Sequence, residues 1–191
     1  MPGVRGAVLA TLAQLALPVT VRALARHAGV SPQGALEVVN ELARAGIVAV
    51  APAGRSLMVS LNRDHLATEP ILGLVGLRAR LVERLTVELA GWSNLAGGWL
   101  FGSAARGDGD STSDIDLLLV ADHIPDQEWE ATCADLTTQV RAWTGNPTQL
   151  VEHTRTSFAT LRRRRNPLIA ALRSEGIPLT PTSPDLLRGA A

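Results

Sequence analysis

Lysine and tyrosine are missing from this sequence of 191 residues, and cysteine occurs only once, at Cys133. A single cysteine excludes a disulfide bond within the chain and is typical of a reducing compartment, so a cytoplasmic localisation is predicted. Because lysine is missing, all 18 basic residues are arginines. Together with the many alanine, leucine and glycine residues, this indicates the codon bias of a GC-rich genome rather than a function.

Long apolar runs are also missing, since no segment reaches the roughly 18 uninterrupted apolar residues of a membrane-spanning helix. The sequence therefore predicts no membrane partner. Residues 6–19, which follow Arg5, superficially resemble a signal peptide. Gln14 interrupts this segment, and Val8 and Leu12 stand at helical spacing, so we interpret it as a first amphipathic helix.

A net charge is missing as well, because 18 acidic residues balance the 18 basic ones, and the whole chain offers no field that attracts nucleic acid. The balance differs along the chain: residues 1–66 contain six arginines and three acidic residues, a net charge of +3, and the remainder is −3. With 46% apolar residues, the chain is long enough to form two cores. We expect a mildly basic binding domain followed by an acidic catalytic domain.

The first 66 residues follow the pattern of a winged helix-turn-helix domain. Ser31 followed by Pro32 is a favoured helix start, and Gly29 is typical of a helix end. The expected elements are a helix at 5–16, a helix from Thr20 to His27, a helix between Ser31 and Gly46, and a β-hairpin of strands 47–51 and 56–61. Two short helices and a following hairpin are the order of this domain. Residues 21–31 resemble bacterial winged-helix regulators.

Duplex DNA is the partner expected for such a domain. Its third helix enters the major groove with its N-terminal residues leading. Ser31 and Gln33 stand at that end here, and glutamine can pair with the edge of adenine. Arg44 and Arg55 are expected to contact phosphates. Two glutamates on the same helix would repel phosphates, so binding to another protein stays open as the alternative role.

The rest of the chain predicts an α/β domain. The expected elements are a long helix at 70–90, strands at 99–101, 115–121 and 148–152, a helix at 126–143, a last helix at 166–174 and an extended segment at 177–179. Residues 67–92 are therefore assigned to a linking helix, 93–183 to the second domain and 184–191 to a flexible tail. The whole chain is predicted to be a two-domain α+β protein.

The chemistry is expected between the first two strands of this second domain. A strand ends at Gly102 and Ser103, where a helical turn begins and offers backbone amides and a hydroxyl to a phosphate. Ten residues later Asp114 and Asp116 begin the next strand, whose alternation puts both carboxylates on one face. Two such carboxylates repel each other unless a cation lies between them. Mg²⁺ is typically held by one or two carboxylates and by substrate phosphates, so these residues predict metal-assisted attack on a phosphate.

Residues 101–120 resemble the polymerase-β-like nucleotidyltransferase superfamily, in particular the minimal nucleotidyltransferases of bacteria and archaea. The signature of that family is Gly-Ser, ten residues and Asp-x-Asp. The segment 175–179 is similar to the same family, and the likeness covers about residues 75–180. The resemblance implies an α/β fold with a short mixed sheet, Mg²⁺ as cofactor and a nucleoside triphosphate as donor. It also implies that the metal is held by the catalytic pair Asp114 and Asp116. The triphosphate would be bound by Gly102, Ser103, Arg106 and Ser113.

One departure from the family concerns the third carboxylate, which usually comes from the next strand and activates the acceptor hydroxyl. Gln149 occupies the expected acidic position, and glutamine can neither act as a base nor bind Mg²⁺ well. Glu152 is the nearest acid, but three residues along a regular strand place it on the opposite face. Glu152 is therefore a catalytic residue only if the strand is bulged or ends there.

Two functions follow from this reading. The first is an Mg²⁺-dependent nucleotidyltransferase whose acceptor is a protein, an RNA end or a small hydroxyl compound, and some members of the family act as antitoxins on a partner toxin. The alternative is a transcriptional regulator whose degenerate transferase domain senses a nucleotide. The presence or absence of a third carboxylate discriminates between them.

The sequence leaves the roles of several charged or reactive residues undecided. The arginines at 162–165 would grip a triphosphate, RNA or an acidic partner, or would form a solvated face at the start of a helix. Cys133 fits the apolar stripe of a helix, and no histidine stands at a spacing that would make it a nucleophile. His123 and His153 form no metal-binding pattern with it.

Overall fold

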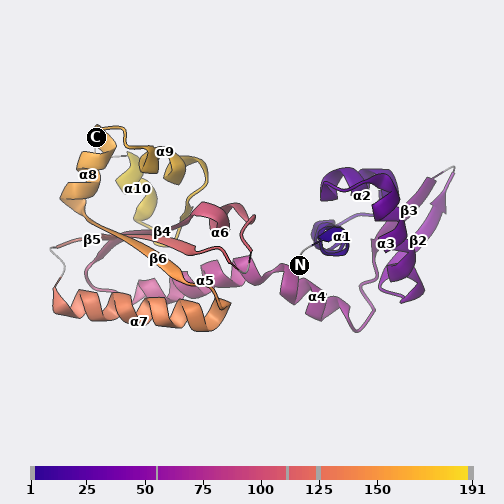
Figure 1. The fold of residues 1–191 in the computed structure, drawn as a ribbon, viewed down its shortest axis with the longest axis horizontal. Helices are drawn as coiled ribbons and strands as arrows, with labels where there is room; N and C mark the ends of the chain where they lie inside the picture. Colours follow the sequence, from indigo (N-terminus) through magenta and orange to yellow (C-terminus); the bar gives the residue numbers. More distant parts are fainter. Residues whose placement is uncertain (1–2, 55, 111, 124–125, 189–191) are drawn as a thin grey trace. The chain divides into compact units, whose positions relative to one another are not determined.

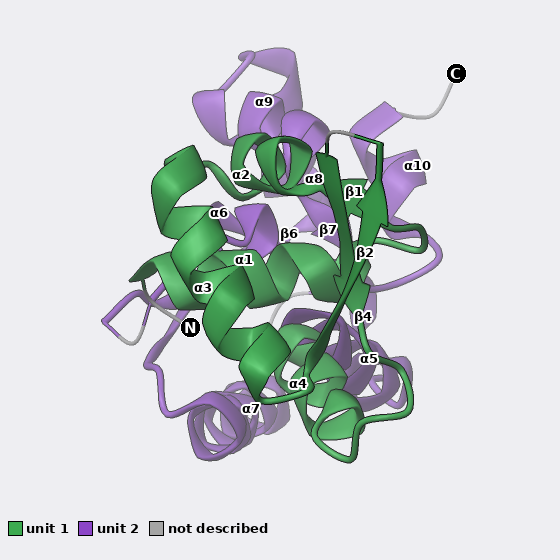
Figure 2. Cartoon of the chain, turned by 90° about the vertical axis from the view of Figure 1, so that its right-hand side faces the viewer, with its two compact units in different colours: residues 1–77 green, residues 78–191 purple. Residues whose placement is uncertain are grey.

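The computed structural model describes residues 3–54, 56–110, 112–123 and 126–188. The chain divides into two compact units, residues 1–77 and 78–191, which Figure 2 colours separately. The predicted linking helix at 67–92 is therefore shared between the two units. No helix among the described residues is both long enough and apolar enough to cross a membrane.

The first unit combines helices with a small antiparallel sheet. Its elements are α1 (Gly3–Gln14), β1 (Val19–Thr20), α2 (Val21–Ala28), α3 (Pro32–Arg44), β2 (Val48–Ala53), β3 (Ser56–Leu61) and α4 (Thr68–Val75). The strands are ordered β1-β3-β2, and both pairs are antiparallel. The winged-helix assignment of this unit stays a prediction.

The helix starts predicted in the first unit are confirmed by their hydrogen bonds. The Thr20 hydroxyl accepts from the amide of Ala23 at 3.2 Å, and the Ser31 hydroxyl accepts from the amide of Gly34 at 3.0 Å. Val8 and Leu12 of α1 are fully buried in the core of this unit, as their spacing predicted. Residues 6–14 are therefore part of a packed helix.

The second unit has a mixed α/β fold with a four-stranded mixed sheet, as the sequence predicted. Its elements are α5 (Leu77–Ala90), β4 (Leu95–Phe101), α6 (Gly102–Arg106), β5 (Ile115–Ala121), α7 (Gln127–Thr144), β6 (Thr148–Thr154), α8 (Arg155–Arg163), α9 (Pro167–Ser174), β7 (Ile177–Pro178) and α10 (Ser183–Arg188). The strands are ordered β6-β5-β4-β7, and only the pair β5 and β6 is parallel.

The two faces of this sheet are covered by different helices (Figure 1). On one face, Leu117 and Leu119 of β5 pack with buried residues of α5 and α7. On the other face, Leu118 and Val120 pack with Phe158 of α8 and with residues of α9. The alternation of β5 therefore sorts its residues between two cores, and Asp116 shares the face of Leu118.

Two predicted elements differ from the observed ones, and two observed helices, α8 and α10, were not predicted. The helix expected at 70–90 is two helices, because α4 ends before Gly76 and α5 begins after it. β4 begins at Leu95 instead of residue 99, since Gly97 and Gly98 belong to the strand although glycine disfavours strands. A Cβ atom on Gly97 would lie 2.6 Å from the Leu186 side chain, so this glycine allows α10 to pack closely on β4.

The helix α8 was not predicted, because its sequence has no apolar stripe at helical spacing. Phe158 is its only buried residue among those described. The arginines expected at the start of a helix stand at its end instead: Arg162 and Arg163 are in the last turn of α8, and Arg164 caps it. Four adjacent arginines favour a helix C-terminus, where the dipole attracts positive charge.

Candidate functional site

The ends of β4 and β5 bring the two halves of the predicted motif together. These strands are antiparallel, and Phe101, the last residue of β4, is paired with Asp116 near the start of β5. Gly102 follows with a φ of 67°, in the left-handed region that favours glycine. A Cβ atom on Gly102 would lie 2.1 Å from Oδ2 of Asp116. The Asp116 carboxylate therefore lies directly against the Gly102 backbone and excludes a side chain there.

The Asp116 carboxyl is influenced by burial and by two charged neighbours, Asp114 and Arg106. Partial burial raises the pKa of Asp116 above its ordinary value, and the negative charge of Asp114 raises that pKa further. The positive charge of Arg106 acts in the opposite direction and lowers it. The site therefore places two carboxylates and one guanidinium close enough to influence one another, and the ionised pair is energetically unfavourable without a cation.

Ser103 lies in the first turn of α6, under the loop that follows this helix. Its carbonyl accepts hydrogen bonds from the amides of Gly107 at 2.9 Å and Asp108 at 3.2 Å. A Cβ atom on Gly109 would approach the Ser103 hydroxyl to 3.1 Å, so the loop passes close over that hydroxyl. Asp116 thus lies against Gly102, and Ser103 follows Gly102 in the chain; the role of these residues in binding a phosphate stays a prediction.

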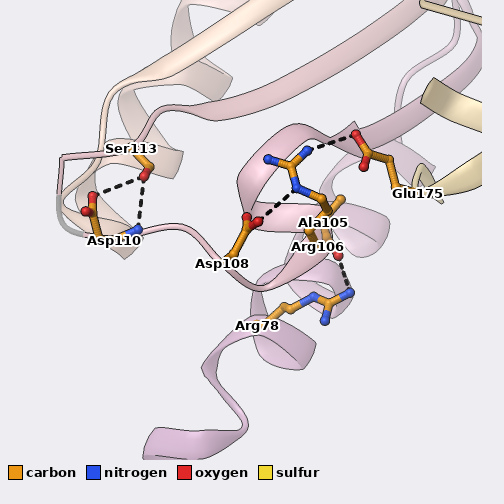
Figure 3. A network of polar contacts seen from close by, with 7 residues as sticks. All are labelled: Arg78, Ala105, Arg106, Asp108, Asp110, Ser113 and Glu175. Atoms are coloured by element: carbon orange, nitrogen blue, oxygen red, sulfur yellow. Dashed lines mark hydrogen bonds and ion pairs between the residues drawn. The ribbon is translucent and has the colours of Figure 1, made fainter. Parts of the chain in front are cut away.

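Ser113, which was predicted to bind nucleotide, is part of a turn built around Asp110 (Figure 3). Its hydroxyl accepts from the Asp110 amide at 3.0 Å and donates to the Asp110 carboxylate at 3.1 Å. Bonds from Thr112 and then Ser113 lower the pKa of Asp110, because they stabilise its charged form. The side chain of Asn146 donates to the carbonyls of Asp110 and Ser113 at 2.8 and 2.7 Å, which anchors the turn.

Arg106 is held between two carboxylates (Figure 3). Its Nε donates to Asp108 at 3.0 Å, and its Nη1 donates to Glu175 at the end of α9, also at 3.0 Å. Both bonds raise the pKa of Arg106. Arg78 of α5 donates to the carbonyl of Ala105, the residue before Arg106. Glu175 was not among the predicted site residues, although the segment 175–179 had been recognised as similar to the family.

The position of the third carboxylate is occupied by Gln149. In the parallel register of β5 and β6, Gln149 is paired with Asp116 and Val151 with Leu118. Val151 packs in the core on the α8 side, whereas its neighbour Leu150 packs in the core on the α7 side. Gln149 therefore lies on the same face of the sheet as Asp116, and its side chain is exposed.

Glu152, the predicted catalytic acid, is not brought to the aspartate pair. Its partner in the register is Leu119, and the register between β5 and β6 runs without a shift from Ile115 to Ala121, so no bulge turns it toward Asp116. The Glu152 carboxylate instead accepts a hydrogen bond from the indole of Trp129 on α7. It lies on the α7 face, as the alternation of a regular strand requires.

Cys133 is a buried neighbour of Glu152. Its sulfur lies 3.6 Å from the Glu152 carboxylate. Burial raises the pKa of the thiol to about 12, with the negative charge of Glu152 as a second cause. A thiol with this pKa stays protonated at neutral pH, so Cys133 has the properties of a core residue rather than a nucleophile.

A divalent cation fits the donor set of the aspartate pair. Asp114 and Asp116 supply the oxygen ligands that Mg²⁺ prefers, and a bound cation would offset the repulsion that raises the Asp116 pKa. Within the described part of the chain, no group of three or more histidine, cysteine, aspartate or glutamate side chains is placed to hold a metal.

Three of the four residues predicted to contact DNA lie at the two ends of α3. Ser31 and Gln33 are exposed at its N-terminal end, although the Ser31 hydroxyl caps the helix and Gln33 donates to Glu37 at 2.9 Å. Arg44 is exposed at the C-terminal end and donates to the Asn40 carbonyl at 3.3 Å. Arg55 lies outside the described residues.

Comparison with known families agrees with the geometry of the second unit. Residues 89–155 match the family described as Nucleotidyltransferase domain. These residues form a nucleotidyltransferase domain. The matched segment of this nucleotidyltransferase domain contains Gly102, Ser103 and both aspartates, whereas Glu175 lies beyond it. No curated protein matches the chain.

Two solved structures are similar to about half of the chain. One is a mutant of the toxin–antitoxin MntA-HpeT, 19% identical, with a TM-score of 0.37 over 51% of this chain and 71% of that chain. The other is a toxin–antitoxin crystallised with AMP-PNP, 21% identical, with a TM-score of 0.35 over 52% of this chain and 70% of that chain.

Proposed function

We propose that the nucleotidyltransferase domain transfers a nucleotidyl group from a nucleoside triphosphate to a hydroxyl-bearing acceptor in the presence of Mg²⁺. The observation that carries this proposal is the placement of the Asp116 carboxylate against the Gly102 backbone, with Asp114 beside it. A phosphate bound at the Gly102-Ser103 turn would lie next to two carboxylates suited to hold its metal. The acceptor is a protein, an RNA end or a small hydroxyl compound.

Each residue of the site has a role in this proposal. Asp114 and Asp116 would hold Mg²⁺, which when bound neutralises the charge that develops on the transferred phosphate. Ser103 would donate its hydroxyl to a phosphate oxygen. Arg106 would offset part of the negative charge of the triphosphate, since it lies close enough to Asp116 to lower the pKa of that carboxyl. Ser113 would act through the Asp110 turn that precedes Asp114.

A second function is favoured by the position of Gln149. Because a glutamine stands opposite Asp116, the site has a donor half without an evident base for the acceptor hydroxyl. The domain would then bind nucleotide without turnover and act as a sensor for a DNA-binding first unit. Ser31, Gln33, Arg44 and Arg55 would provide the DNA contacts.

Metal-dependent binding of triphosphate tests the site shared by both functions. Asp114→Asn together with Asp116→Asn should abolish Mg²⁺-dependent binding of ATP, GTP, CTP or UTP in calorimetry, because both ionised ligands are lost. Glu152→Gln is the matched control, since Glu152 faces α7 and should leave binding unchanged. Unchanged affinity in the double aspartate variant would disprove the assigned site.

Transfer of labelled nucleotide to components of a host lysate separates the two functions. A labelled product with the wild-type chain identifies an enzyme and the class of its acceptor. If the wild-type chain gives no product but Gln149→Asp does, the missing base is the cause, because general-base catalysis is worth about 10²–10⁴-fold. A product that is lost in Glu152→Gln would show instead that Glu152 is catalytic.

Binding of the first unit to DNA is tested separately. Arg44→Ala should weaken binding of the chain to its own promoter fragment and reduce the salt dependence, because a phosphate contact is lost. Gln33→Ala should relax sequence preference instead, since a base contact specifies sequence. No binding of the fragment at low salt would indicate a protein-interaction role for this unit.

A further inference from the structure

Three consecutive exposed arginines form the corner between α8 and α9. We call Arg163, Arg164 and Arg165 the basic turn. The fourth arginine of the run, Arg162, has a structural role, because its Nη1 donates to the carbonyl of Leu186 at 2.7 Å and holds the end of α10. Arg163 also donates to the hydroxyl of Thr160 one turn back, at 3.1 Å. The aspartate site uses none of the three arginines of the basic turn.

The backbone of the basic turn is one that glycine normally adopts. The amide of Arg165 donates to the Arg162 carbonyl at 3.1 Å, and the amide of Asn166 donates to the Leu161 carbonyl at 3.0 Å. This pair of bonds is the Schellman motif, whose residue after the cap is left-handed and usually glycine. Arg165 occupies that position with a φ of 51°.

The same chain uses glycine at every other described position of this kind. Gly29, Gly107 and Gly145 end α2, α6 and α7 in the left-handed region. Among the described residues, Arg165 is the one non-glycine residue with a positive φ. Backbone strain that the fold does not require points to a role for the side chain that carries it.

Attraction to the helix dipole explains only part of the basic turn. A positive charge near the last carbonyls stabilises a helix, and this accounts for Arg163 in the last turn of α8. It does not account for an arginine at the left-handed position, where glycine would remove the strain. Ion pairing does not explain the basic turn either, because no carboxylate of the described residues lies within 4.0 Å of a basic-turn guanidinium.

The surroundings of the basic turn favour one class of ligand. From residue 144 to 188, none of the described residues is an exposed large hydrophobic one. A protein interface has an apolar core with anchoring side chains, whereas nucleic-acid interfaces are polar and strongly positive. Guanidinium groups bind phosphate oxygens in a bidentate geometry. We propose that the basic turn binds the phosphate backbone of a nucleic acid.

The proposal is tested by anisotropy of the full chain with labelled single-stranded RNA and DNA of one sequence, about 20 nucleotides long. No triphosphate is added, so the result is independent of the transferase proposal, and single strands avoid the duplex ligand proposed for the first unit. The variants are Arg163→Gln with Arg164→Gln, and Arg165→Gly. The control is Arg141→Gln, which removes an exposed arginine from the last turn of α7, on the other face of the sheet (Figure 1).

The expected losses follow from counterion release. Two phosphate contacts contribute about 1.4 to the slope of log affinity against log salt, so the double variant should bind roughly 25-fold more weakly at about 0.1 M salt. Arg165→Gly should lose roughly fivefold in affinity for the same reason, while its melting temperature rises because the strain is removed. Arg141→Gln should bind like the wild type.

Several results would overturn the proposal. They are no binding of either strand by the wild type, wild-type affinity in the double variant, and a lower melting temperature for Arg165→Gly. Displacement of RNA by poly-glutamate as efficiently as by unlabelled RNA would indicate an acidic protein instead. Equal affinity for RNA and DNA supports recognition through phosphate alone, and tighter binding of RNA supports added contacts to the 2′-hydroxyl.

Discussion

A methyl group at Gly102 tests the geometry on which the proposed metal site depends. In Gly102→Ala, the new Cβ would overlap Oδ2 of Asp116 at 2.1 Å, and Cγ of that carboxyl would be 3.0 Å away. Contacts this short do not occur, so the Asp116 carboxylate has to move. The backbone adds a second cost, because an alanine with a φ of 67° is in the left-handed region, which costs about 1–2 kcal/mol.

Gly145→Ala is the matched control for this variant. Gly145 ends α7 with a φ of 79°, and a Cβ there would meet no heavy atom within 4 Å. Its cost is therefore that of the left-handed backbone alone, about 1–2 kcal/mol, or a fall of about 2–8 °C in melting temperature. Gly102→Ala should fall at least as far, with the displaced carboxylate as the additional cause.

The two variants should differ most in ligand binding. Calorimetry with Mg²⁺ and a nucleoside triphosphate should show a loss of about tenfold or more for Gly102→Ala, equivalent to about 1.4 kcal/mol. Gly145→Ala should bind like the wild type, because its site is intact. Wild-type affinity in Gly102→Ala would refute the reasoning, since the metal would then not depend on the position of the Asp116 carboxylate.

Three further outcomes are expected. Glu175→Gln should change the free energy of unfolding by less than about 1 kcal/mol, because the ion pair of Glu175 with Arg106 is partly exposed. Calorimetry should show that this variant binds triphosphate severalfold more tightly. One negative charge beside Arg106 is then removed, while Asp108 still holds the guanidinium. Asp116→Asn should raise the melting temperature of the metal-free chain at neutral pH, because a carboxyl with a raised pKa destabilises the fold when it is charged. The difference from wild type should shrink as the pH falls below that raised pKa and should be absent once the pH is below the ordinary pKa of an aspartate. Cys133 should resist alkylation in the folded chain and react only in denaturant, as mass spectrometry would show, because its thiol is buried and its pKa is about 12.

The part of the site that the sequence predicted is the part that lies close together along the chain. Gly102 and Asp116 are separated by one loop between two paired strands, so the register of that hairpin brings them together. The alternation of β6 likewise predicted that Gln149 and Glu152 face opposite sides of the sheet, and the register confirms this. The short separation in sequence and the alternation of strand residues were sufficient to predict both features.

Contacts between distant segments could not be predicted in the same way. Glu175 reaches Arg106 across 69 positions of sequence because α9 ends beside α6, and no periodic pattern encodes that packing. The contact of Glu152 with Trp129 depends on how α7 packs across β6. α8 was missed because its face is mostly polar, and β4 was shortened because two glycines in it serve close packing instead of strand propensity.

The two halves of the site are built on elements that the fold constrains differently, and this makes position 149 a sharp test. The triphosphate side of the site, with Gly102, Ser103 and Asp116, is built on the two central strands β4 and β5 and on α6, which follows β4. Gln149 is instead exposed on β6, an edge strand. Gln149→Asp therefore leaves packing unchanged and adds a like charge directly opposite Asp116, which costs about 0.2–1 kcal/mol in a metal-free chain. A bound cation would offset that repulsion, so Mg²⁺ should raise the melting temperature of Gln149→Asp more than that of the wild type. Equal stabilisation of both chains by Mg²⁺ would show that residue 149 does not face the metal, whatever the effect of the substitution on transfer.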